Sequence, residues 1–128
     1  MTDSPSEVRL SDAEHVVMEV LWSAGQPLAA SEIADRVPAD RDWSFATVKS
    51  LLSRLLAKQA VAPSKDGRRF QYLPAIEREP YVAAESRRFV KRLFGGKLSP
   101  MFARLAEQEA LDDDDVAAIE ALLKELRN

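Results

Sequence analysis

The chain has 128 residues, of which 46% are hydrophobic and 30% are charged, and its formal net charge is −3. This length allows one domain, or one small domain with an appendage, and the apolar content excludes a disordered protein. With no cysteine and one histidine, the chain cannot form disulfides, thiolate metal sites or an imidazole cluster, so we expect no cofactor and no metal.

The first two expected helices are short and have clear ends. The first begins with a capping box, in which Glu14 follows Ser11 by three positions. Apolar residues then recur at helical spacing until Gly25 stops the helix. The second helix covers about 30–37.

A third helix is expected at about 45–58, with Ser44 as its N-cap. At 100° per residue its apolar residues form one stripe, made of Val48, Leu51, Leu52, Leu55 and Leu56. The opposite face is small and hydroxylated, with Ala46, Ser50, Ser53 and Ala57 in the middle and Thr47, Lys49 and Arg54 at its flanks. A solvated helix more usually carries Glu–Lys pairs there, so this face is a candidate for contact with another molecule.

Positive charge is concentrated around this helix. Residues 1–40 hold two Lys or Arg against eight Asp or Glu, a net charge of −6, whereas residues 41–69 hold seven against two, a net charge of +5. The negative net charge of the whole chain argues weakly against binding to nucleic acid, whereas the positive charge of residues 41–69 argues for it. The polar N-terminus MTDSPSEVRL is not a signal peptide, and no apolar run approaches the ~20 residues that cross a bilayer. We therefore expect a cytoplasmic protein without membrane insertion.

Two strand-like runs, AVAPSK and RRFQYLP, flank the dipeptide Asp66-Gly67, which is typical of a hairpin turn. Arg68 and Arg69 lie beside its tip. Three short helices followed by a hairpin is the order of a winged helix, whose third helix enters the DNA major groove while the hairpin reaches the flanking backbone. We predict a mostly α fold with a small β-hairpin wing, whose winged helix-turn-helix domain covers residues 1–75.

Residues 76–128 are typical of a C-terminal helical dimerisation domain. A long helix ends at Gly95-Gly96, another starts at Ser99-Pro100 with Ser as its N-cap, and a last one follows Asp112 to Asp115. These carboxylates favour a helix N-terminus over a metal site, because consecutive positions do not share a helix face. These three helices cannot bury their own apolar stripes, so we predict a homodimer held by Phe89, Leu93, Phe102, Leu105, Val116, Ile119, Leu122, Leu123 and Leu126.

The segments LSDAEHVVMEVLW, ATVKSLLSRLLAKQAV and GRRFQYLP resemble, in order and separation, the penicillinase-repressor family of bacterial transcription regulators, the BlaI/MecI/CopY type. The likeness covers about residues 10–126. It implies a homodimeric repressor without enzymatic activity that binds inverted-repeat operators in double-stranded DNA. It also implies control of β-lactam resistance or a similar stress-response gene set, and release through a membrane-bound sensor protease.

The family's recognition helix falls on Ser44 to Lys58. The resemblance implies DNA contacts by Ser44, Ala46, Thr47, Lys49, Ser50, Arg54, Arg68 and Arg69. For Arg54, an ion pair with an acidic residue of the first or second helix stays open as an alternative.

Two departures from the family pattern concern its signals. The copper-responsive branch carries a C-terminal cysteine site, which this chain lacks. The β-lactam branch is cut at an Asn-Phe bond, and the matching position is Met101-Phe102, where Phe is kept and Asn is not. Cleavage and release by a small ligand therefore both stay open.

Two other classes of function compete with that of a repressor. A winged-helix module that binds another protein through the same face is the second interpretation, and the +5 segment favours DNA over it. An enzyme has no support, because the sequence offers no Ser/Cys–His pair, Gly-rich phosphate loop or paired carboxylates in a plausible cleft.

Overall fold

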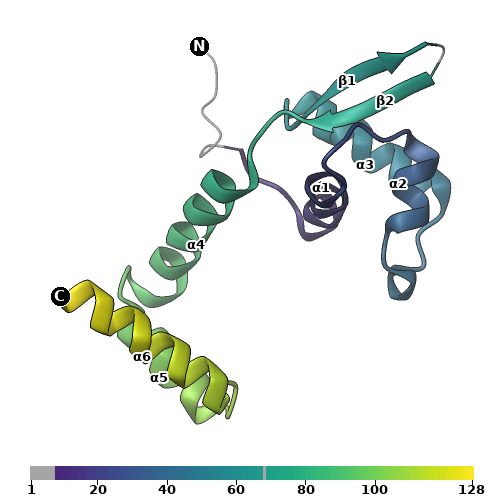
Figure 1. The fold of residues 1–128 in the computed structure, drawn as a ribbon. Helices are drawn as coiled ribbons and strands as arrows, with labels where there is room; N and C mark the ends of the chain where they lie inside the picture. The colour runs from purple at the N-terminus through teal and green to yellow at the C-terminus, as the bar shows by residue number, and fades with distance from the viewer. Residues whose placement is uncertain (1–7, 68) are drawn as a thin grey trace. The chain divides into compact units, whose positions relative to one another are not determined.

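The computed structural model describes residues 8–67 and 69–128, and Figure 1 shows its elements in chain order. They are α1 (Asp12–Ala24), α2 (Ala30–Arg36), a 3₁₀ turn (Ala39–Arg41), α3 (Phe45–Ala57), β1 (Val61–Asp66), β2 (Arg69–Pro74), α4 (Arg78–Phe94), α5 (Leu98–Glu107) and α6 (Asp113–Arg127). This confirms a mostly α fold with a two-stranded wing. The chain forms two compact units, Met1–Glu85 and Ser86–Asn128, and the division falls within α4.

The ends of α1 follow the sequence signals. The Ser11 hydroxyl accepts a hydrogen bond from the Glu14 backbone N–H at 3.1 Å, and the Glu14 carboxylate accepts one from the Ser11 backbone N–H at 2.7 Å. At the other end, Gly25 adopts a φ of +66°, a conformation that costs an L side chain energy. The predicted capping box and helix stop are therefore confirmed.

The core of the first unit lies where α1, α2, α3 and the wing meet. Its large apolar side chains that are fully buried are Val17, Met18, Leu21, Leu28, Ile33, Val48, Leu52 and Leu55. The wing is tied to this core by a backbone pair between Leu28 and Tyr72, with N–H···O distances of 3.0 and 2.7 Å. The Trp22 indole N–H donates to the Ile76 carbonyl at 3.0 Å and so fixes the chain where it leaves the wing.

The wing is an antiparallel hairpin that starts its turn one residue later than the sequence indicated. Val61 pairs with Pro74 at one end, and Asp66 pairs with Arg69 at the other. Asp66 therefore belongs to β1, and Gly67 follows it with a φ of +64°, which suits a tight turn. Arg68 lies outside the described residues.

The second unit has almost no fully buried side chain. Of residues 86–128, all of which are described, Val90 alone is buried. The helix α5 begins at Leu98 with Lys97 as its N-cap, so the predicted start at Ser99-Pro100 is wrong. Because proline is tolerated throughout the first helical turn, Pro100 did not mark the first residue of α5.

None of the helices within 8–67 and 69–128 is long and apolar enough to cross a membrane.

Candidate nucleic-acid interface

The N-terminus of α3 is suited to bind an anion. The Ser44 hydroxyl accepts a hydrogen bond from the Thr47 backbone N–H at 3.1 Å and lies 3.0 Å from the Thr47 hydroxyl. The first turn of α3 carries no acidic residue, so no carboxylate of this turn neutralises the positive end of the helix dipole. Helix ends of this kind bind phosphate through their backbone N–H groups.

The faces of α3 match the predicted stripe. One face buries Val48, Leu51, Leu52 and Leu55. The opposite side, called the outward face below, exposes Ala46, Lys49, Ser50, Ser53, Arg54 and Ala57, with Thr47 half-buried at its edge. Small side chains in the middle of this face let the helix backbone approach another surface closely.

Two cations of the outward face have no acidic partner among the described residues. Arg54 forms no ion pair within 8–67 and 69–128, although the sequence left open a pair with α1 or α2. The Lys49 ammonium also lacks a carboxylate in this part of the chain and lies 5.9 Å from the centre of the Phe45 ring. Both charges are exposed and can meet an external anion.

Two other cations of the +5 segment are already engaged within the first unit. The Lys58 ammonium lies 2.5 Å from the Glu14 carboxylate and donates to the Arg9 carbonyl at 2.8 Å. The Arg69 guanidinium lies 2.7 Å from the Glu32 carboxylate. The net charge of the segment therefore overstates the positive charge that is available to a partner.

The pKa values of these two carboxyls follow from their surroundings. Burial is the largest influence on Glu14 and raises its pKa, yet the hydrogen bonds from Lys58 and Ser11 outweigh it, so the pKa lies below the usual value. One Glu14 oxygen is buried without a partner among the described atoms. For Glu32, the hydrogen bond from the Ala29 backbone N–H is the main cause of a lowered pKa, and the charge of Arg69 adds to it. Both glutamates are thus ionised at neutral pH and hold their cations.

The wing exposes the aromatic side chain of Phe70, which follows Arg69 in β2. Phe70 is 44% exposed and meets Tyr72 edge-on, with 5.1 Å between ring centres. Tyr72 is buried, so it anchors the strand while Phe70 stays at the surface.

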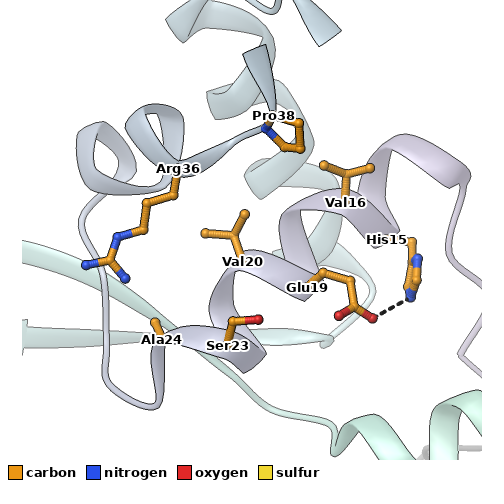
Figure 2. A pocket seen from close by; sticks show the side chains of 8 residues that line it. All are labelled: His15, Val16, Glu19, Val20, Ser23, Ala24, Arg36 and Pro38. Atoms are coloured by element: carbon orange, nitrogen blue, oxygen red, sulfur yellow. Dashed lines mark ion pairs between the residues drawn. The ribbon is translucent and has the colours of Figure 1, made fainter. Parts of the chain in front are cut away.

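A separate hollow of about 430 Å³ lies beside α1 and the end of α2. Figure 2 shows its aliphatic lining of Val16, Val20, Ala24 and Pro38. At its rim the His15 imidazole lies 3.1 Å from the Glu19 carboxylate, which also accepts a hydrogen bond from Arg78 at 2.9 Å. The His15 imidazole and the Glu19 carboxylate that border this hollow therefore already have partners within the chain.

The residues predicted for dimerisation lie mostly at the surface of the second unit. Phe89, Leu93, Val116, Leu122, Leu123 and Leu126 are exposed, and Phe102, Leu105 and Ile119 are half-buried. On α6, Asp112 and Asp115 form a reciprocal capping box, so these two carboxylates serve the helix N-terminus. Met101 and Phe102 both lie inside α5 and are half-buried.

The sequence-based prediction of the site did not include Phe45, an aromatic side chain at the start of α3. Phe45 is the first residue of this helix and is 50% exposed. Just before it, the Arg41 guanidinium lies 5.7 Å from the centre of the Trp43 ring. On a helical projection Phe45 falls at the edge of the apolar stripe and looks like a core residue. Its position in the first turn, beyond the end of the core, was the one sign in the sequence that its side chain would be exposed.

Comparisons with known proteins agree with this geometry. The sequence model of the family described as "Penicillinase repressor" matches residues 10–125. The penicillinase repressor of Bacillus licheniformis is 30% identical over 120 residues, which are 94% of this chain and 93% of that protein.

Two solved structures resemble the first unit. The solution structure of the DNA-binding domain of the repressor BlaI is 33% identical with a TM-score of 0.51, and the match covers 63% of this chain and 94% of that domain. The monomeric form of Bacillus licheniformis BlaI, solved in complex with the blaP half-operator, is 34% identical with a TM-score of 0.50 and covers 57% of this chain and 88% of the other.

Proposed function

Because the chain belongs to the penicillinase repressor family, and so is a DNA-binding transcriptional repressor and not an enzyme, we propose that it acts as a homodimer on an inverted-repeat operator. Residues 1–75 would contact the DNA, and residues 76–128 would join the two copies. The observation that carries this proposal is the outward face of α3, which is small at its centre and bears Lys49 and Arg54 without acidic partners among the described residues.

Each predicted contact residue receives a role from its place on α3 or the wing. Ser44 and Thr47 lie at the helix N-terminus, where a phosphate binds best. Ala46, Lys49 and Ser50 follow within the first two turns, the part of a recognition helix that meets base edges. Arg54 is later on the helix and is assigned to the DNA backbone.

The wing contributes to the backbone contacts through Arg69 and, outside the described residues, Arg68. Since Arg69 is already paired with Glu32, it would have to exchange or share this partner when it meets a phosphate. We therefore expect Arg69 to add less to the affinity than Arg54 does.

Dimerisation is supported by the apolar side chains that the second unit leaves exposed. A dimer with two α3 helices binds two half-sites related by the same two-fold symmetry. The protein would then reside in the cytoplasm with its operator and control β-lactam resistance or a similar stress response.

Release is proposed to follow cleavage at or near Met101-Phe102, triggered through a membrane-bound sensor protease. Immunoblotting of cells treated with a β-lactam tests this step. A full-length band that persists while the target genes are induced contradicts cleavage and points to a small ligand or a partner protein as the releasing signal.

The test of the DNA-binding face is Lys49→Ala, measured by fluorescence anisotropy on an operator recovered by selection from random DNA. We expect a loss of about 1–3 kcal/mol and relaxed specificity if Lys49 contacts a base. If it binds a phosphate instead, the slope of log K against log salt should become shallower by about 0.9 for each phosphate that the variant no longer neutralises.

The matched control is Lys97→Ala, which removes the same charge from the second unit and should leave operator affinity nearly unchanged. Unchanged affinity for Lys49→Ala at moderate salt would mean that the recognition face has been misplaced.

A further inference from the structure

Phe45 is a large apolar side chain that the fold leaves partly exposed. It is the first residue of α3, immediately after the cap residue Ser44, and half of its surface is exposed. It lies one helical turn before Lys49, whose ammonium sits 5.9 Å from the ring centre. The exposed central residues of the outward face are Ala or Ser, so Phe45 is the bulkiest apolar group beside that face.

The end of α3 that carries Phe45 is the end that reaches deepest into DNA in this architecture. In helix-turn-helix proteins the N-terminal residues of the recognition helix contact base edges in the major groove. An apolar side chain there has one kind of apolar partner, because the C5-methyl group of thymine is the only alkyl group on a major-groove base edge, and phenylalanine is among the residues that contact it.

We propose that Phe45 reads a thymine by packing its ring against the thymine methyl group in each half-site. The proposal rests on the proposed function, since it needs α3 to enter the major groove. It adds an apolar specificity contact to the polar and cationic ones assigned to Lys49 and Ser50.

The contact between Phe45 and Lys49 strengthens this assignment. A cation over the ring face leaves the ring edge and its other face for the base, and it restricts both side chains before DNA arrives. A side chain already ordered in the free protein loses less conformational entropy on binding.

The experiment compares thymine with deoxyuridine, which lacks only the methyl group, at each position of the selected operator. Burial of one methyl group corresponds to about a fourfold change in affinity, so wild-type protein should prefer thymine by about fourfold at one position of each half-site. Phe45→Ala should bind the thymine and deoxyuridine operators equally well.

Phe70→Ala is the matched control, because it removes a similarly exposed phenylalanine from the wing and should keep the preference for thymine. Circular dichroism checks that both variants fold. The proposal is overturned if Phe45→Ala keeps the thymine preference, or if no position of the operator discriminates. A wild-type protein that selects no DNA sequence defeats the proposed function itself, which separates that failure from the failure of the methyl contact.

Discussion

The two units of this chain treat their apolar side chains in opposite ways. In Met1–Glu85 the stripes of α1 and α3 are covered, and residues such as Met18, Leu52 and Leu55 are fully buried. In Ser86–Asn128, which the structure describes throughout, Val90 alone is buried, while Leu122 is 60% and Leu126 is 82% exposed. The first unit thus builds a core from its own helices, and the second carries a surface that we infer a second copy covers.

The largest effect is expected from a charge placed in the exposed stripe of α6. Leu123→Asp puts an unpaired carboxylate where the partner chain is proposed to pack, which should weaken the dimer by about 3–5 kcal/mol. Analytical ultracentrifugation should then find monomers whose winged helix is still folded.

Ala121→Asp is the matched control for this change, since Ala121 lies on the other side of α6 and its substitution should leave the dimer intact. A wild-type protein that is monomeric at micromolar concentration would refute the assignment of this surface.

A smaller effect should follow when the second unit is removed altogether. A fragment of residues 1–85 should unfold cooperatively, because its core is complete, and it should bind one half-site with unchanged specificity. Affinity for the full operator should fall by about 100-fold or more, because two half-sites on one dimer gain an effective concentration that a monomer lacks. Equal operator affinities of fragment and full chain would mean that the second unit does not join two DNA-binding units.

The smallest effect concerns the ion pair inside the first unit. Glu14→Gln removes the charge that holds Lys58 and should lower the free energy of unfolding by about 1.5–3 kcal/mol, the range for hydrogen bonds to charged groups. Urea denaturation measures it. Glu19→Gln in the same helix is the control and should cost at most about 1 kcal/mol, because its pairs with His15 and Arg78 are partly exposed.

The same variant carries a pH signature. The pKa of Glu14 is lower in the folded chain than its ordinary value of 4.5, so its contribution is fully present above that value and is lost as the pH falls through the folded pKa. The stability difference between wild type and Glu14→Gln should therefore be largest near neutral pH and shrink below about pH 4.5. A difference that stays constant down to pH 3 would show that the charge of Glu14 is not what stabilises the fold.

The sequence predicted those features that are set by neighbours in the chain. The capping box at Ser11 and Glu14 and the cap at Ser44 each need only a few consecutive residues, and the apolar stripe of α3 needs only its period. The engagement of Lys58 could not be foreseen, because Glu14 is 44 positions away and a count of charges cannot tell which of them meet. The exposure of Phe45 could not be predicted for a related reason, since helical spacing does not tell where the neighbouring core ends.

The position of Met101-Phe102 inside α5 has a kinetic consequence for the cleavage that we propose. A peptide bond must leave the helix before it can lie extended in a protease, so cleavage depends on how often α5 unfolds locally. When opening and reclosing are fast, the cutting rate follows the small population of the open form. Any partner that binds the folded form of α5 lowers that population. Subunits that have separated would then be cut faster than paired ones, and the lifetime of each copy would depend on how much of the protein the cell contains.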